Sequence, residues 1–128
     1  MIRDALPEDA ESIRLFLAGN GWAHRVRDAE RFAQLLRQSQ RTAVCVEDHA
    51  VVGFARAITD GLSNGYLSMV VVASTHRRRG LGRALVEHIV RGDEAITWVL
   101  RAGRDGAEEF FASLGFQASL VAMERCRR

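Results

Sequence analysis

The sequence predicts a single α/β domain in which a mixed β-sheet packs between about four helices. The chain has 128 residues, of which 48% are hydrophobic, so it can form one compact core but is too short for two. Segments with the two-residue period of strands alternate with segments that have the period of helices. No linker, repeat or charge block interrupts them, and we therefore expect residues 1–128 to form one domain.

The N-terminal half predicts two helices and a β-hairpin. A helix begins at Pro7, among acidic residues, and ends at the Gly-Asn-Gly of residues 19–21. A second helix is predicted from about Asp28 to Gln38, where apolar residues recur at helical spacing. Two alternating segments, Thr42 to Glu47 and Val51 to Ile58, flank a tight turn and predict the hairpin.

The C-terminal half predicts the remaining elements. A turn at residues 60–65 leads into a strand from Tyr66 to Val72, and an amphipathic helix starts at Gly82. Further elements are a strand at residues 96–101, a helix beyond Ala107 and a final strand near Val121 to Arg125. With a short strand at the N-terminus, the predicted order is β-α-α-β-β-β-α-β-α-β.

The segment from Val70 to Leu85 is the most informative part of the chain. A run of β-branched residues passes through a cationic glycine turn into a helix. Gly80 and Gly82 lack a Cβ, so the backbone can adopt positive φ and a ligand can approach closely. The first N–H groups of the helix point into the turn, and the helix dipole adds positive charge there. An anion site is therefore predicted, with full charges from Arg77, Arg78, Arg79 and Arg83.

The glycine spacing narrows the choice of anion. A P-loop requires Gly-Lys-Ser/Thr, which is absent, and a Rossmann turn requires a third small residue where this chain has Leu85. The remaining pattern is Arg-x-x-Gly-x-Gly, formed by Arg77, Gly80 and Gly82. It resembles the acyl-CoA-binding signature of the GCN5-related N-acetyltransferases, the GNAT family. Residues 96–116 are similar to the family's next strand, helix and Leu-Gly-Phe turn, and residues 2–10 to its first strand and helix.

The resemblance implies a GNAT-like fold, acetyl-CoA as the cofactor and transfer of an acetyl group to a primary amine of a small molecule or peptide. Two other functions stay open. One is a coenzyme A-binding, catalytically weak regulatory module of the same fold. The other is a nucleic-acid-binding domain built on the arginine turn, which the net charge of only +2 and the lack of interleaved aromatic residues disfavour.

The resemblance also implies how the cofactor is held. In the family, the pantetheine arm fills a gap between two splayed parallel strands as an added strand would, here beside Val70 and Val72. A backbone N–H of Val70 or Val71 would stabilise the oxyanion, and the glycine turn would hold the pyrophosphate. Arg104 stands where an asparagine often contacts the arm. The predicted cofactor-binding residues are Val70, Val71, Val72, Arg77, Arg78, Arg79, Gly80, Leu81, Gly82, Arg83 and Arg104.

The catalytic residues are less clearly marked. The family often has a tyrosine acid where this chain has Phe111, so the usual proton donor for the leaving thiolate is missing. Tyr66, the only tyrosine, stands near the strand position where many relatives have a glutamate base. Strict alternation places Tyr66 and Ser68 on one face together with Val70 and Val72. Tyr66 and Ser68 are therefore the candidates for positioning the amine or a proton-relaying water; a packed ring with a solvated hydroxyl is the alternative for Tyr66.

A few residues are candidates for contacts with the acceptor amine. Trp22 and Tyr66 are candidate substrate contacts, although Trp22 could equally close the core, and Arg56 and Asp60 would fit recognition of a charged or polar group. Two cysteines at unrelated spacing predict no metal site. The chain has no apolar stretch of membrane-spanning length and no signal sequence, so we expect a cytoplasmic monomer or homodimer without membrane or nucleic-acid partners.

Overall fold

A five-stranded sheet forms the centre of the computed structural model, which describes residues 1–92 and 94–128. The strands follow one another in the order β1 (Ile2–Arg3), β2 (Arg41–Glu47), β3 (Ala50–Thr59), β4 (Asn64–Val72) and β5 (Thr97–Val99). The first three pairings are antiparallel, whereas β4 and β5 run parallel. The predicted mixed sheet is thus confirmed.

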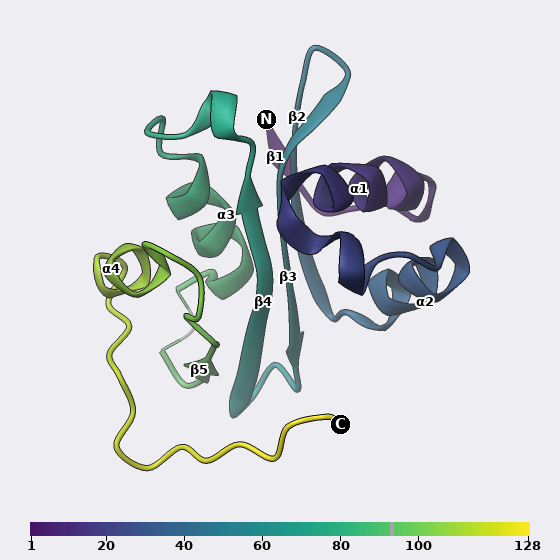
Figure 1. The fold of residues 1–128 in the computed structure, drawn as a ribbon. Helices are drawn as coiled ribbons and strands as arrows, with labels where there is room; N and C mark the ends of the chain where they lie inside the picture. Colours follow the sequence, from purple (N-terminus) through teal and green to yellow (C-terminus); the bar gives the residue numbers. More distant parts are fainter. Residues whose placement is uncertain (93) are drawn as a thin grey trace.

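Two helical layers cover the two faces of this sheet (Figure 1). On one face lie α1 (Ala10–Leu17), which follows a 3-10 turn at Pro7–Asp9, and α2 (Ala29–Gln38). On the other face lie α3 (Leu81–Val90) and α4 (Ala107–Ala112). All four helices were predicted. The start of α2 also has a local cause, because the Asp28 side chain accepts a hydrogen bond from the Arg31 backbone N–H and so caps the helix.

The sheet separates two hydrophobic cores. The core under α1 and α2 is made of Ile13, Leu17, Val26, Phe32, Leu36, Val44, Phe54, Met69 and Val71. The core under α3 and α4 is made of Ala43, Cys45, Val52, Ala55, Ala57, Leu67, Leu85, Val86, Ile89 and Phe111. Residues next to one another in β2 and β3 contribute to opposite cores, as the two-residue period of a strand requires.

The hairpin between β2 and β3 has the predicted tight turn. Glu47 pairs with Ala50, so the loop between the strands has only two residues, Asp48 and His49. Their φ angles are 50° and 64°, which places both in the left-handed region. A two-residue hairpin turn of type I′ needs this conformation because its twist matches that of the strands.

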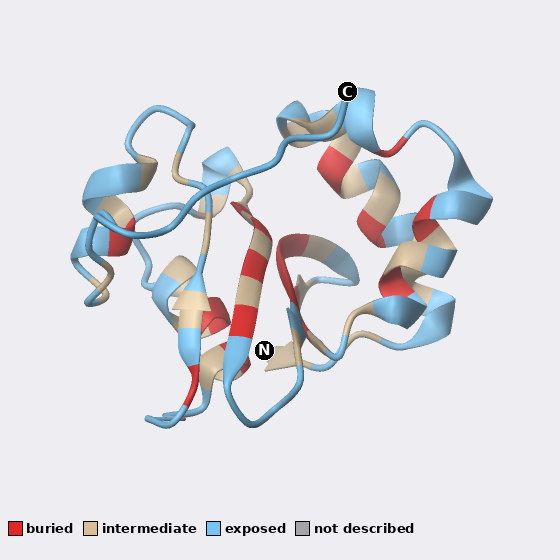
Figure 2. Cartoon of the chain, turned by 90° about the horizontal axis from the view of Figure 1, so that it is seen from below, coloured by how far each residue is buried: buried red, intermediate tan, exposed pale blue. Residues whose placement is uncertain are grey.

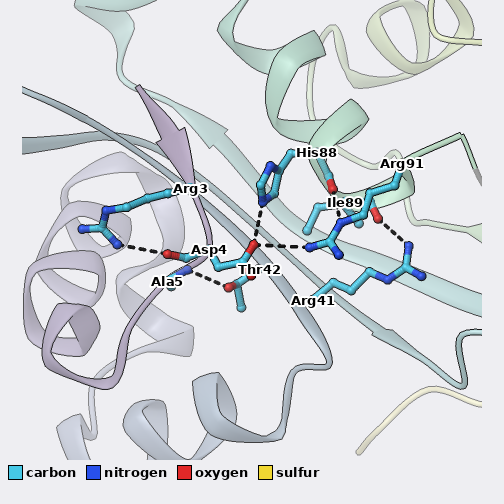
Figure 3. Close-up of polar contacts among 8 residues, drawn as sticks. All are labelled: Arg3, Asp4, Ala5, Arg41, Thr42, His88, Ile89 and Arg91. Carbon is cyan, nitrogen blue, oxygen red and sulfur yellow. Dashed lines mark hydrogen bonds and ion pairs between the residues drawn. The ribbon is translucent and has the colours of Figure 1, made fainter.

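An ion-pair cluster ties the N-terminus to the end of α3 (Figure 3). Oδ1 of Asp4 lies 2.6 Å from Nε2 of His88 and 3.3 Å from Nη2 of Arg91. Beside it, Nη1 of Arg41 donates to the carbonyl oxygen of Ile89 at 2.7 Å. These contacts link the C-terminal end of α3 to the residue after β1 and to the start of β2.

The predicted final strand near Val121 to Arg125 is wrong. The structure assigns no strand to residues 117–128, and this segment is pale blue along its length in Figure 2. The side chains of Leu120, Val121 and Met123 are 100%, 88% and 95% exposed. A strand needs a neighbour to complete its hydrogen-bond ladder, and the short β5 offers little edge for one.

We expect Asp9→Asn to lower the free energy of unfolding by about 1 kcal/mol at pH 7. The Asp9 carboxylate accepts two hydrogen bonds from Arg3, at 2.7 and 3.0 Å, and one from the Leu6 N–H at 2.7 Å. The Arg3 contact, supported by the Leu6 hydrogen bond, lowers the pKa of Asp9 below its ordinary 3.8. A depressed pKa stabilises the fold above the unfolded-state value, and this contribution is lost as the pH falls through the folded-state value.

Urea unfolding at pH 7 and at pH 2.5–4 measures this effect. The matched control is Glu8→Gln, which removes the same charge from an exposed neighbour in the same turn. An equal loss in both variants, or a loss for Asp9→Asn that does not shrink in acid, would contradict the assigned role of the carboxylate.

Candidate functional site

The parallel strands β4 and β5 are paired only at their beginnings. The pairs are Asn64 with Thr97, Gly65 with Trp98 and Tyr66 with Val99. Gly65 permits this contact, since a Cβ there would lie 2.3 Å from the Trp98 ring. Beyond Tyr66, β4 continues to Val72 with no strand beside it on that edge in the described part of the chain. Backbone groups along this edge are therefore free to pair with an extended ligand.

A β-bulge interrupts β4 just beyond the point where the strands separate. Phe54 pairs with Val71, whereas Arg56, two residues further along β3, pairs with Ser68, so β4 contains one extra residue there. Met69 has a φ of 55°, in the left-handed region that methionine rarely adopts. A bulge of this kind locally turns the strand and re-aims its backbone groups and side chains.

The bulge makes the predicted alternation of β4 wrong. Leu67 packs into the core under α3, so its neighbours Tyr66 and Ser68 face α1 and α2. Val70 and Val72 also pack against the α3 core, although strict alternation would place them with Tyr66 and Ser68. The extra residue reverses the order. The polar candidates and the two valines therefore lie on opposite faces of the strand.

A cleft of about 580 Å³ lies where β4 ends and α3 begins. The end of β4, the glycine turn, the first turn of α3 and the loop before α4 form its walls. Among the residues predicted to bind the cofactor, those lining the cleft are Val70, Val71, Val72, Arg77, Arg78, Gly80, Leu81, Gly82, Arg83 and Arg104. Asn20, His76, Asp105, Phe110 and Phe111 also line it. The tertiary fold brings Asn20 there from the segment Ala18–Trp22, which follows α1, and no pattern in the sequence indicates that position.

The two glycines of the turn have different structural roles. Gly80 is the residue before α3 and has a φ of 79°, and a Cβ there would meet nothing within 4 Å. Its backbone conformation favours glycine, and the space around it is open. At Gly82 a Cβ would lie 2.9 Å from the ring of Phe110. Gly82 therefore allows α4 to pack closely on α3, in addition to any approach by a ligand.

The arginines of the turn are divided between the cleft and the hairpin. Arg77 and Arg78 line the cleft. The guanidinium of Arg79 instead lies 3.4 Å from both carboxylate oxygens of Glu47, which is also 3.4 Å from Nε2 of His76. Arg79 does not appear among the described residues of the cleft wall. To contact the cofactor as predicted, the Arg79 side chain would have to leave Glu47, or to bind Glu47 and the cofactor at the same time.

Arg104 and Trp22, predicted separately for cofactor and substrate, lie together. The Arg104 guanidinium carbon sits 4.2 Å from the centre of the Trp22 ring, within the range of a cation–π contact. Nη2 of Arg104 also donates to the carbonyl oxygen of Gly21 at 3.0 Å. The ring of Trp22 packs on the core under α1 and α2, so both of its predicted roles remain compatible with its position. Arg104 thereby connects the segment after α1 to the cleft.

Phe111, which replaces the usual acid, and the two catalytic candidates differ in burial. Phe111 is only 9% exposed, belongs to the α3 core and lines the cleft, and its ring makes edge contacts with Phe110 and Phe116. A phenyl ring at this position has no proton to donate. Tyr66 and Ser68 are partly exposed, and within the described chain neither hydroxyl has a hydrogen-bond partner. Both hydroxyls can therefore bond to a ligand or to water.

None of the helices in the described ranges is long and apolar enough to cross a membrane. Over the same ranges, His, Cys, Asp and Glu side chains form no group that could hold a metal ion.

The chain is similar to acetyltransferases in both sequence and fold. The sequence profile of the Acetyltransferase (GNAT) domain matches residues 38–118. A GNAT-family acetyltransferase from Streptococcus pneumoniae superposes with a TM-score of 0.82 at 21% identity, covering 100% of this chain and 98% of that one. Ribosomal-protein-alanine N-acetyltransferase from Brucella melitensis gives 0.78 at 21% identity, covering 100% and 99%.

A third solved structure contains a ligand. AAC(6')-Iy in complex with a bisubstrate analogue, CoA-S-monomethyl-acetylneamine, superposes with a TM-score of 0.76 at 17% identity, covering 100% of this chain and 97% of that one. Among curated protein sequences, none matches the chain. The profile match over more than half of the chain, together with the sheet that separates after Tyr66 and the arginine–glycine turn, shows that the chain belongs to the GNAT acetyltransferase family.

Proposed function

We propose that the protein transfers the acetyl group of acetyl-CoA to a primary amine of a small molecule or peptide. The observation that carries this proposal is the cleft at the separated edge of β4, which ends at the arginine–glycine turn and the N-terminus of α3. An extended backbone edge suits an amide-containing arm. The helix N-terminus and the arginines suit a pyrophosphate.

The lining of the cleft fits coenzyme A chemically. N–H groups in the first turn of α3 and the side chains of Arg77, Arg78 and Arg83 would hold the phosphates. Apolar side chains such as Leu81 and Phe110 would cover the arm. When bound, acetyl-CoA supplies a thioester carbonyl, to whose carbon the amine nitrogen bonds as the C–S bond breaks and the thiolate leaves. The bonded nitrogen then gives up one proton, to water or to the departed thiolate, to form the neutral amide.

The chain's own groups would serve the two ends of this reaction. An N–H of Val70 or Val71, beside the bulge, would donate to the carbonyl oxygen as it gains charge. The attacking amine has to be neutral, and an alkylammonium with a pKa near 10.4 must first lose a proton. Tyr66 and Ser68 would orient the amine or a water that accepts this proton. Phe111 gives no proton to the thiolate, which with an ordinary pKa of about 8.5 can leave without one.

Phe111 is also the observation that favours the second candidate, a coenzyme A-binding regulatory module with weak catalysis. The two functions differ in turnover and share the same cleft. Release of free thiol from acetyl-CoA with a panel of amines distinguishes them, because a regulatory module would bind acetyl-CoA without releasing thiol at a useful rate.

We expect Arg78→Ala to raise the dissociation constant for acetyl-CoA at least about tenfold, since a hydrogen bond to a charged group contributes about 1.5–3 kcal/mol. Isothermal titration at two salt concentrations should also show a weaker salt dependence. Arg37→Ala is the matched control, because it removes the same charge from an exposed position on α2, across the sheet. Wild-type affinity in Arg78→Ala would show that the turn does not hold the phosphates.

We expect Tyr66→Phe to lower kcat about tenfold or more for an accepted amine while the dissociation constant for acetyl-CoA stays unchanged. The hydroxyl lies on the α1–α2 face of β4, away from the face on which Val70 and Val72 pack. Steady-state thiol release gives the rate, and titration gives the affinity. Should Tyr66→Phe and Ser68→Ala both keep wild-type kcat and KM, the acceptor does not bind on this face.

A further inference from the structure

A buried arginine without a counter-ion lies beside the proposed acceptor face. Arg56, in β3, is only 6% exposed. Its Nε donates to Oγ of Ser39 at 2.8 Å. Across the described residues, its Nη1 and Nη2 have no hydrogen-bond partner and no carboxylate pairs with it. The guanidinium therefore presents unused donors.

The surroundings of Arg56 do not compensate its charge. Burial lowers the pKa of Arg56, and only the neighbouring Tyr66 acts in the opposite direction. Ser39 follows the last residue of α2, so the partial negative charge of that helix end is also close. A buried full charge without a partner is costly, and a helix end offsets only part of that cost. An anion bound at this point would supply the missing partner.

Two further free donors lie next to this guanidinium. Ser68 is directly opposite Arg56 on β4, and Tyr66 pairs with the next residue of the same face, Ile58. Side chains opposite each other across antiparallel strands lie about 5 Å apart, and diagonal ones about 7–8 Å. In the described structure, neither hydroxyl forms a hydrogen bond. The three side chains together offer donors without a carboxylate among them.

The donors are also within reach of solvent. Among the described residues, the side-chain nitrogens that are fully buried and lack a hydrogen-bond partner belong to Trp22 and Trp98. The unpartnered nitrogens of Arg56 are not fully buried, so a ligand can reach them.

Asp60, the other residue considered for recognition of a charged group, already has hydrogen-bond partners. Its Oδ1 accepts N–H bonds from the backbone of residues 62, 63 and 64, so it shapes its own turn.

We propose that Arg56, with the hydroxyls of Tyr66 and Ser68, binds a carboxylate on the acceptor, so that the acetylated amine is part of an ω-amino acid or a similar carboxylate-bearing amine. This inference rests on the proposed acetyl transfer. A guanidinium fork matches the two oxygens of a carboxylate. Ser68 and Val71 pair with Arg56 and Phe54, which are two positions apart on the regular strand β3, about 7 Å at the usual rise. The amine and the carboxylate are therefore separated by several bonds.

The test uses ω-amino acids from β-alanine to 6-aminohexanoate, each beside its primary amide, as acceptors for the purified protein. In the wild type, we expect kcat/KM to be at least about tenfold higher for the best acid than for its amide, mainly through KM. Arg56→Gln should abolish this preference by raising KM for the acid, with little change for the amide. Arg56→Lys should restore part of it, and Arg37→Gln, which removes an exposed charge from α2, should behave as the wild type.

Binding measured without turnover separates this inference from the proposed function. Titrations of the same acids and amides should show tighter binding of the acids by the wild type. Arg56→Gln should bind acids and amides with similar affinity. Unchanged acetyl-CoA affinity and a wild-type melting temperature would show that Arg56→Gln is folded. If the variant does not fold, the ratio of kcat/KM for acid and amide in the wild type decides alone.

Several results would overturn the inference. Equal kcat/KM for acids and amides would exclude a carboxylate site while leaving acetyl transfer intact. A preference for phosphoethanolamine over every ω-amino acid would assign the site to a phosphate instead. If no amine releases thiol, the proposed acetyl transfer is wrong. The titrations then decide on the carboxylate site alone: equal affinity for acids and amides, or an acid preference that Arg56→Gln retains, would exclude it.

Discussion

The separation of β4 from β5 after Tyr66 is the constraint on which the rest of the site depends. A parallel sheet that stayed paired to Val72 would have no free edge for an extended ligand, and α3 and α4 would close over a continuous core. Gly65 allows the Trp98 ring to lie against β4 at the second of the three pairs, and the strands separate after the next pair, Tyr66 with Val99. The bulge at Met69 follows within the freed stretch and turns its backbone. The end of the freed stretch, Val70 to Val72, forms one wall of the cleft.

Arginines lie near β4 in two separate places. Arg77, Arg78 and Arg83 lie at the cleft, beside the positive end of α3. Arg56 lies on the opposite face of the sheet, under the end of α2, where burial lowers its pKa. The separation matters because the first group is exposed and screened by salt, whereas the second is largely buried and is screened less. Strand β4 thus has arginine side chains near both of its faces.

Much of the fold could be predicted from local pattern, because helices, hairpin and glycine turn each depend on a few neighbouring residues. Asp28 caps α2 and the residues 48–49 close the hairpin by purely local chemistry. The bulge could not be predicted, since nothing in the sequence requires Met69 to adopt positive φ. The pairing of Arg79 with Glu47 and of Arg104 with Trp22 depends on segments brought together by the whole fold. The prediction of a final strand was wrong because alternating apolar and polar residues do not by themselves provide a neighbouring strand to pair with.

The contact of Arg104 with Trp22 and Gly21 has a consequence for how the two proposed ligands would influence each other's binding. One guanidinium touches both the wall of the cleft and the linker between α1 and α2. Under the proposed function, acetyl-CoA that restrains Arg104 in the cleft would also restrain that linker, and an acceptor that contacts Trp22 would restrain Arg104 in return. By thermodynamic linkage, any gain in affinity is equal in both directions. Occupation of either site would then favour the ternary complex over the two binary ones, with no large movement of the backbone.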